Sequence, residues 1–306
     1  MDMRIIIGLF ALTLVKATPL TLGALSGVFC ERSGVVNIGI EGMMLTSAFT
    51  GFSAAFFSGS ALVGIAVALA TGGLLALLHA VLCIRFELNQ IISGTVINLM
   101  AVGVTGYFNR VIFSGRTVPG VETLPRVEIP LLADIPFIGP ILFQHQPIVF
   151  TTIILVFLVH IVLFHTPWGL RTRAVGEHPR AADTLGIDVF KVRYINVVVG
   201  GMIAGLAGAF LTLEAVGTFE KLMSNGRGFI ALAAMVFGKW SPVGAFGAAL
   251  LFGFAEALGV RLQIENIGIP YQFLGMLPYL LTIIVLAGVV GRSTPPAASG
   301  QPYRKE

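Results

Sequence analysis

Long apolar runs, separated by short polar breaks, occupy most of the chain. A helix needs roughly 20 apolar residues to cross about 30 Å of hydrocarbon, and runs of this length recur from one end of the sequence to the other. The pattern predicts helices at about residues 5–29, 38–57, 60–84, 91–113, 147–165, 192–213, 226–238, 243–262 and 271–290. We therefore predict an all-α fold, a polytopic membrane helix bundle of about eight to ten transmembrane helices.

Composition supports a membrane protein. Of the 306 residues, 56% are hydrophobic and 11% are charged, whereas average soluble domains have roughly 25% charged residues. Cys30 and Cys83 lack metal-ligand spacing, so we predict neither a metal site nor a disulfide framework. The net charge of +4 fits Lys- and Arg-rich cytoplasmic loops, and no nucleic-acid-binding pattern is found. The first apolar run lacks a small-residue cleavage pattern and is predicted to be a retained span.

Loop charges predict the orientation. Residues 166–194 carry an excess of Arg and Lys, whereas residues 114–146 carry a mixture dominated by Glu and Asp. Because cytoplasmic loops are enriched in basic residues, the first segment is predicted to be cytoplasmic and the second external. The N-terminus is then external if the first run is one span. Lys16 and Pro19 interrupt that run, so Lys16 either faces a cavity or partner, or snorkels from a shorter or kinked helix.

Two short, glycine-marked elements indicate an internal repeat. They read "SGVVNIGIEGMMLTSAF" and "NGRGFIALAAMVFGKW", and each leads into a span rich in Ala and Gly. With the predicted topology the two copies run in opposite directions, which gives inverted repeats at about 34–113 and 226–290. Such repeats with broken helices are typical of transporters and predict a site near the bilayer midplane. The alternative is that Gly and Ala only mediate helix packing, as in "GMIAG" at 201–205.

The segment at about 166–191 has a pattern of its own. It contains "WGLRTRAVGEHPRAADTLGI", in which Pro179 suits the first position of a helix that ends at Gly186. A short amphipathic helix outside the bilayer can dock into a groove on a soluble partner. We call residues 166–191 the coupling segment. The alternative is an ordinary basic cytoplasmic loop.

Three motifs, "ERSGVVNIGIEGMML", "AVGEHPRAADTLGI" and "GRGFIALAAMVFGKWSPVGAFGAALLFG", resemble the permease subunits of bacterial ABC importers. The branch is the one that includes ribose-type, branched-chain amino-acid and nucleoside permeases. The resemblance covers nearly the whole chain and implies a type II importer fold in one permease domain, residues 1–306, in the bacterial inner membrane. The "NIGIEG" form resembles permeases for nucleosides or simple sugars; ribose permeases more typically have "GGIDLSVG" there.

The same resemblance implies partners. These are a separate ABC ATPase subunit, an extracytoplasmic substrate-binding lipoprotein, and a second related permease or a second copy of this chain. The ATPase would dock on the coupling segment. The residues implied in coupling are Arg171, Arg173, Gly176, Glu177, Pro179, Arg180, Ala181, Ala182, Gly186 and Ile187.

No phosphate-binding loop of the form G-x-x-x-x-G-K-[ST] is present. The one Gly-Lys pair, Gly238 and Lys239, is followed by Trp240, and Ala233 occupies the position of the first glycine. We therefore predict a transport subunit that is not an enzyme and binds no cofactor, with ATP used by a partner.

Two other classes remain as alternatives. An ion-coupled secondary transporter needs acidic or His residues deep in the spans. Glu41 is the main candidate, because Glu214 and Glu256 lie at or near predicted helix ends. If Glu41 couples protons, Glu41→Gln abolishes uptake; if it satisfies a helix break, the loss is partial. An intramembrane enzyme is disfavoured, since the His residues lack the i, i+4 spacing of a zinc motif.

We select six residues as candidates that line the translocation pathway, Asn37, Gly39, Glu41, Gly42, Asn98 and Phe229. Asn37 and Glu41 are four apart and are expected to share a helix face, and the two glycines allow close approach of a backbone or a substrate. Phe229 offers a ring for stacking. The alternatives are interhelical hydrogen bonds of about 0.6 to 2 kcal/mol for the polar groups and ordinary packing for Phe229.

Two segments outside the spans complete the organisation. Residues 114–146 are rich in proline and are predicted to form a semi-rigid external lid or docking surface, or else a solvated loop. The tail, residues 292–306, includes "STPPAASGQPYRKE" and is predicted to be disordered.

Overall fold

The computed structural model describes residues 3–113, 120–265 and 293–305, together with residues 273, 275, 276 and 280. In chain order the elements are α1 (Met3–Arg32), α2 (Ile40–Ser58), α3 (Ala61–Ala80), the π-helical turn η1 (Val81–Arg85), α4 (Gln90–Phe113), β1 (Val127–Glu128), α5 (Ile138–Leu142), β2 (Gln144–His145), α6 (Pro147–His165), α7 (Pro167–Glu177), α8 (Pro179–Thr184), α9 (Val189–Ala209), the π-helical η2 (Phe210–Val216), α10 (Arg227–Phe237) and α11 (Pro242–Ile264).

The predicted all-α, polytopic bundle is confirmed. Among the described residues, six helices are long and apolar enough to cross a membrane, counting α3 with η1 and α9 with η2. The bounds lie within three residues of the predicted ones. The predicted helix at 271–290 falls almost wholly outside the described residues. We call the end that carries α7 and α8 the inner end, and the end that carries α5 the outer end, following the orientation predicted from loop charges.

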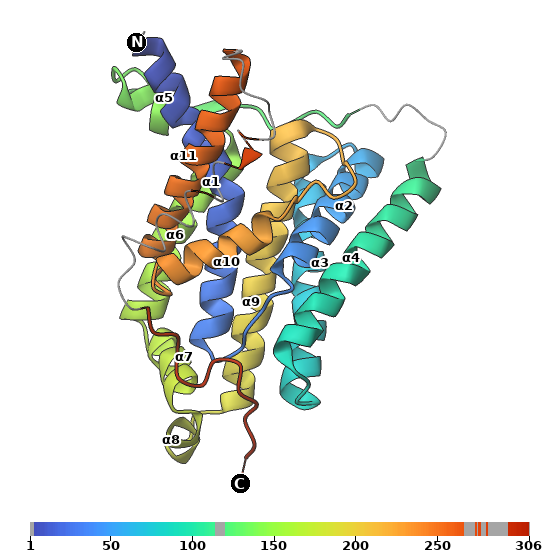
Figure 1. Ribbon diagram of the computed structural model, residues 1–306, viewed down its shortest axis with the longest axis vertical. Helices are drawn as coiled ribbons and strands as arrows, with labels where there is room; N and C mark the ends of the chain where they lie inside the picture. Colours follow the sequence, from blue (N-terminus) through green and yellow to red (C-terminus); the bar gives the residue numbers. More distant parts are fainter. Residues whose placement is uncertain are drawn as a thin grey trace.

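Helices α1 and α9 form the centre of the bundle. In Figure 1, α2, α3 and α4 lie on one side of this centre, α6 and α11 lie on the other, and α10 crosses the front. The inner half of α1 is buried on all faces from Ala17 to Glu31, as expected for a helix that is apolar all round. Helices α3 and α9 approach backbone to backbone at Gly72 and Gly201, so small residues do mediate packing here.

Both predicted broken elements begin inside the bundle. Residues 33–39, which we call the lead-in segment, run without regular structure from the inner end of α1 to the start of α2. Residues 217–226 run from the outer end of η2 to the start of α10. The two starts meet: a Cβ atom on Gly228 would lie 2.6 Å from the Cα atom of Glu41. The two short elements that the sequence marks as a repeat therefore touch each other, at the starts of α2 and α10.

The described part of the external segment is a short hairpin attached to the bundle. Strands β1 and β2 pair antiparallel, with Val127 opposite His145, and α5 lies between them. The backbone N–H groups of Val121 and Leu124 donate to the carbonyls of Gly217 and Leu213. These bonds fix residues 121–124 against the outer end of η2, and no further span is formed in residues 120–146.

The tail differs from its prediction as a disordered segment. Residues 293–305 lack helices and strands but pack against the inner end, where Ala298 and Tyr303 are buried. Composition disfavours a core within the tail itself. The physical reason for order is that α7, α8 and α9 provide an apolar cluster, Val175, Ala182, Val189 and Val192, that receives the Tyr303 side chain.

Candidate functional site

Glu41 joins the two broken elements. It lies in the first turn of α2, and its Oε1 accepts hydrogen bonds from Ser224 Oγ at 2.6 Å and from the Gly226 N–H at 2.9 Å. Its Oε2 accepts from the Gly228 N–H at 2.6 Å. Gly226 has φ +78°, a left-handed conformation that suits glycine, and it is the N-cap of α10. The carboxylate therefore caps a helix other than its own and sits where the α10 dipole favours a negative charge.

Side chains from α3 and α4 satisfy the lead-in segment. The Val36 N–H donates to Gln90 Oε1 at 2.6 Å, and the Val36 carbonyl lies 3.0 Å from His79 Nε2. His79 Nδ1 lies 3.0 Å from Ser93 Oγ. Irregular backbone inside a membrane protein needs such partners. This role of His79 is not predictable from the sequence, because the only signal is one polar residue near the inner end of an apolar helix.

Asn98 supports the start of α2. Its Nδ2 donates to the Ile38 carbonyl at 3.0 Å, and its Oδ1 accepts from the Gly42 N–H at 2.7 Å. A side chain on Gly42 would collide with the backbone of Asn98, so this glycine permits α2 and α4 to touch. Asn98 therefore forms the hydrogen bonds between elements that were the alternative to a role in the translocation pathway.

The expectation that Asn37 and Glu41 share a helix face is wrong. Asn37 lies before α2, which begins at Ile40. Its Oδ1 accepts a hydrogen bond from the Gly39 N–H at 3.0 Å, and this bond forms a turn ahead of the helix. Its side chain is 0% exposed, and Nδ2 points to sulfur atoms of Cys30 and Met43.

Five of the six candidate pathway residues gather at the start of α2, and Phe229 lies on α10, one residue after Gly228. Phe229 is 49% exposed, so its ring is accessible at the surface of this chain. Contact with a substrate remains a prediction for all six.

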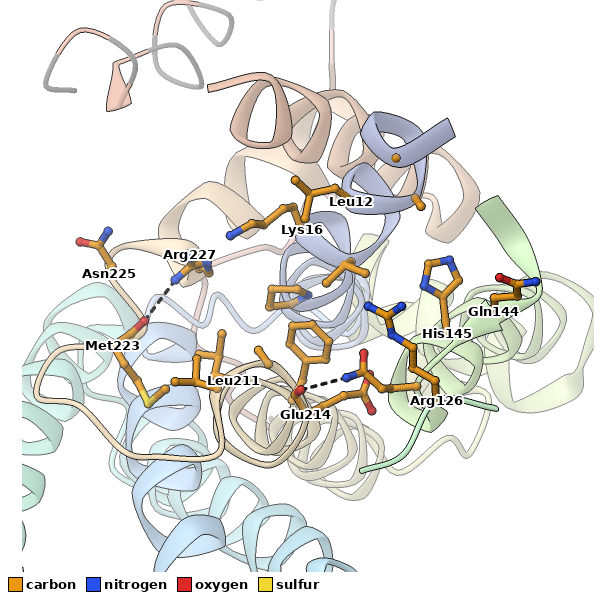
Figure 2. Close-up of a pocket in the computed structure, with 18 of the residues that line it drawn as sticks. Leu12, Lys16, Arg126, Gln144, His145, Leu211, Glu214, Met223, Asn225 and Arg227 are labelled. Atoms are coloured by element: carbon orange, nitrogen blue, oxygen red, sulfur yellow. Dashed lines mark hydrogen bonds between the residues drawn. The ribbon is translucent and has the colours of Figure 1, made fainter. Parts of the chain in front are cut away.

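A cavity of about 1260 Å³ lies beside α1, and Figure 2 shows residues that line it. One wall of the cavity is the face of α1 from Arg4 to Pro19. The other walls are η2, the hairpin of β1 and β2 with α5, and the loop before α10. None of the six candidate pathway residues lines it. Its volume exceeds the roughly 300–1,000 Å³ that encloses one small molecule, so its size fits a vestibule.

Charged side chains are unevenly distributed around this cavity. The basic ones are Arg4, Lys16, Arg126, Lys221 and Arg227, and the acidic ones are Glu214 and Glu220. Burial lowers the pKa of His145 below its ordinary value, and the charge of Arg126 lowers it further, although a bond to the Ile141 carbonyl opposes this. His145 is therefore neutral at pH 7, and the lining carries an excess of positive charge.

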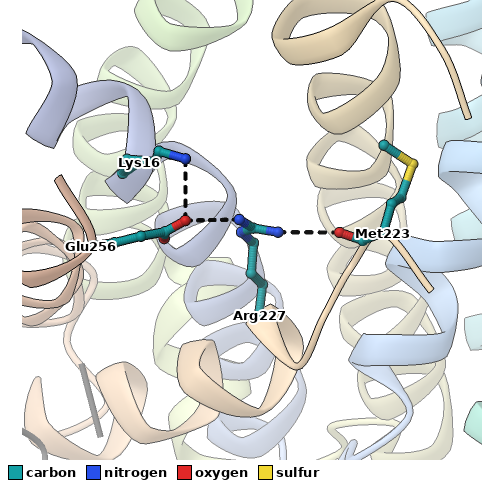
Figure 3. A network of polar contacts seen from close by, with 4 residues as sticks. All are labelled: Lys16, Met223, Arg227 and Glu256. Atoms are coloured by element: carbon teal, nitrogen blue, oxygen red, sulfur yellow. Dashed lines mark hydrogen bonds and ion pairs between the residues drawn. The ribbon is translucent and has the colours of Figure 1, made fainter. Parts of the chain in front are cut away.

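Lys16 and Arg227, which line this cavity, form a network with Glu256 (Figure 3). Glu256 Oε1 lies 3.2 Å from Lys16 Nζ and 2.8 Å from Arg227 Nη2. Arg227 Nη1 also donates to the Met223 carbonyl at 3.1 Å. The network joins α1, α10 and α11. Lys16 thus has Glu256 on α11 as its partner. The helix that carries Lys16, α1, runs without a break from Met3 to Arg32.

Glu214 also has a structural role, at the start of α6. Its carboxylate accepts from the N–H groups of Ile148 and Val149, at 2.8 and 3.3 Å, at the start of α6. Gln146 Nε2 donates to the Glu214 backbone carbonyl at 3.2 Å. Glu41, Glu214 and Glu256 therefore each bind donors of the protein. In the described part of the chain no three His, Cys, Asp or Glu residues form a group that could hold a metal ion.

The coupling segment forms two short helices at the inner end, α7 and α8. Pro179 occupies the first turn of α8, as predicted, and Gly186 has φ +80° after its end. Of the predicted coupling residues, the exposed ones are Arg171, Glu177, Arg180, Ala181 and Gly186, whereas Gly176 and Ala182 are buried, and Arg173, Pro179 and Ile187 are half-buried. The most exposed apolar side chain there, Leu185 at 81%, was missed. A single Leu in "DTLGI" gives no periodic signal.

Gly176 brings the coupling segment against the lead-in segment, since a Cβ atom there would overlap the Arg32 carbonyl oxygen and lie 3.5 Å from the Gly34 nitrogen. Gly176→Ala is therefore expected to push α7 away from this turn, to lower stability by about 1–3 kcal/mol and to reduce uptake. Thermal unfolding in detergent and uptake in cells measure the two effects. Gly247→Ala is the control, because nothing lies within 4 Å of a Cβ atom there. Equal behaviour of the two variants would contradict the expectation.

The family and its members match the chain over nearly its full length. The family model described as "Branched-chain amino acid transport system / permease component" matches residues 9–286. The guanosine ABC transporter permease protein NupQ of Bacillus subtilis is 44% identical, covering 96% of this chain and 95% of that protein. The nucleoside ABC transporter permease protein NupC of Lactococcus lactis is 40% identical, covering 95% of each chain.

A third relative carries a different substrate in its name. The putative glucose ABC transporter permease protein TsgC13 of Haloferax volcanii is 35% identical, covering 98% of each chain. The family match and these identities confirm the resemblance seen in the three motifs. The chain, a multi-pass membrane protein, belongs to this family of ABC transporter permease components.

Proposed function

We propose that this chain moves a nucleoside across the cytoplasmic membrane as the permease subunit of an ABC importer. The observation that carries the proposal is that two relatives, at 44% and 40% identity over nearly the whole chain, are named as guanosine and nucleoside permeases. Transport of a simple sugar is the second candidate, supported by the relative named for glucose at 35% identity.

Uptake by the reconstituted importer separates the two substrates. Proteoliposomes with the permease, its ATPase and its binding protein are loaded with ATP and supplied with labelled guanosine or labelled glucose. We expect ATP-dependent accumulation of guanosine that unlabelled nucleosides reduce and glucose does not. Accumulation of glucose alone would reject the nucleoside and favour the sugar.

Energy would come from the ATPase partner docked on the coupling segment, with a second related permease or a second copy of this chain completing the pore. Leu185 supports the docking site, because it directly follows α8, outside the membrane-spanning helices, and is 81% exposed. Arg180 and Ala181 on α8 are exposed as well. An exposed apolar side chain in a segment that carries basic residues suits a groove on a soluble protein.

Leu185→Asp is expected to weaken ATPase binding. Loss of a buried leucine contact costs about 1.5–3 kcal/mol, which is roughly tenfold in Kd or more. Co-purification and titration with the purified ATPase measure this. Leu131→Asp is the control, because Leu131 is similarly exposed but lies in the external segment. Equal ATPase affinity of the two variants would exclude Leu185 from the docking surface.

A further inference from the structure

Residues 293–305, which we call the C-terminal strap, connect elements that are otherwise far apart in the chain. Figure 1 shows the strap in dark red, passing across the inner end of the bundle. At its start, Ser293 Oγ donates to the Val236 carbonyl at 3.0 Å, near the end of α10. The strap therefore begins on the second broken element.

The middle of the strap binds the coupling segment and the lead-in segment. The Ala298 N–H donates to the Gly176 carbonyl at 2.9 Å, and the Gly300 N–H donates to the Gly34 carbonyl at 3.2 Å. The Ala297 N–H reaches Glu177 Oε2 at 3.2 Å. Within a few residues the strap is thus bonded to α7 and to the first broken element.

The end of the strap is anchored on α8 and the turn before α4. Tyr303 is buried among Val175, Ala182, Val189 and Val192, and its ring lies 5.5 Å from that of Phe190. Its two neighbours form ion pairs, Lys305 with Asp183 at 3.5 Å and Arg304 with Glu87 at 2.7 Å. The exposed pairs add little, so Tyr303 is the main anchor.

Arg193 adds a second anchor below the strap. Its side chain is 2% exposed, and Nη1 donates to the Gln301 carbonyl at 3.0 Å. Among the described residues, Nε and Nη2 have no acceptor, and Nη2 lies beside Gly34. A buried guanidinium is costly unless it is paired, so its bond to the strap carbonyl strongly favours the docked strap.

We propose that the C-terminal strap is a mechanical link that transmits movement of the coupling segment to both broken elements. This inference rests on the proposed function, in which the ATPase docks on α7 and α8. A displacement of α7 and α8 carries the strap through Gly176 and Tyr303, and the strap pulls on the Gly34 carbonyl at the lead-in segment and the Val236 carbonyl at α10. Tyr303 is a positioning residue in this process and contacts no substrate.

The test is uptake per ATP hydrolysed by the complete importer in proteoliposomes. One variant lacks residues 297–305, and Tyr303→Ala removes only the anchor. Both are expected to co-purify with the ATPase and to hydrolyse ATP, while uptake per ATP falls at least about fivefold, the lower end of typical coupling between sites. Thr294→Ala is the control, because Thr294 is an exposed residue of the strap, and this variant should behave as the unmodified protein.

Two results would overturn the link. An unchanged ratio of uptake to hydrolysis in Tyr303→Ala overturns it. So does a parallel loss of ATPase association and uptake, which would make the strap part of the docking surface. If the shortened chain does not accumulate, Tyr303→Ala decides alone. If the unmodified chain fails to bind the ATPase, the proposed function fails before the strap is tested.

Discussion

Glu41→Ala is expected to abolish uptake and to lower the melting temperature of the purified protein. The substitution leaves Ser224 Oγ and the N–H groups of Gly226 and Gly228 without their acceptor. Ser224 and Gly228 are buried, and a buried donor that loses its acceptor costs about 1–3 kcal/mol. A carboxylate at a helix start contributes about 0.3–2 kcal/mol more. The start of α10 would separate from the start of α2. Labelled uptake in cells and thermal unfolding in detergent measure both effects.

Glu41→Gln separates this structural role from proton coupling. Glutamine keeps one acceptor oxygen, but its NH₂ group faces a donor in place of the other oxygen. We expect an intermediate loss of uptake, about tenfold if one hydrogen bond of roughly 1.4 kcal/mol is lost, together with a lowered melting temperature. Glu122→Gln, an exposed carboxylate in the external segment, should change neither. Abolished uptake at an unchanged melting temperature, with uptake driven by an imposed pH gradient, would instead identify Glu41 as a proton site.

Sequence patterns predicted the helices well, because apolar runs of span length leave few choices for a backbone that must satisfy its own hydrogen bonds in lipid. They also identified the two short elements that contain Glu41 and Gly228. The contact between these residues was not predictable, since they lie 187 positions apart and nothing in either motif names its partner. A single sequence marks a polar residue in an apolar run as costly, and only the fold shows which donors offset that cost.

The tail and Leu185 show two different limits. The composition of the tail predicts disorder, because it says nothing of a cluster elsewhere that accepts Tyr303. Leu185 is apolar yet exposed, and exposure of one residue in a short helix has no periodic pattern. In both cases the missing information is the surface that neighbouring elements present.

The sequence predicted only part of the network of Lys16, Arg227 and Glu256. For Lys16 the sequence allows either a cavity or partner, or snorkelling from a shorter or kinked helix. The structure supplies a cavity and a partner. Glu256 was set aside because it lies near a helix end. Its position on α11 nevertheless brings it between α1 and α10, and this follows from packing of three helices and from no local motif.

Glu256→Gln is expected to destabilise the protein strongly and to reduce uptake. It leaves Lys16 and Arg227, which share one carboxylate oxygen, as two neighbouring positive charges without a counter-charge. Removing one partner of a buried ion pair costs about 3–5 kcal/mol. We expect the lower end of this range, because the three side chains are 20–27% exposed. Urea or thermal unfolding in detergent gives the change in stability.

Lys16→Met provides the matched comparison and a rescue. Alone, it leaves the pair of Arg227 and Glu256 intact at 2.8 Å, so its effect should be small. Combined with Glu256→Gln, it leaves only Arg227, which keeps the Met223 carbonyl as an acceptor, and like-charge repulsion is gone. The double variant should therefore be more stable than Glu256→Gln alone, a coupling within the roughly 0.5–3 kcal/mol found for residues in contact. Additive effects of the two substitutions would mean that Lys16 and Glu256 do not interact in the folded protein.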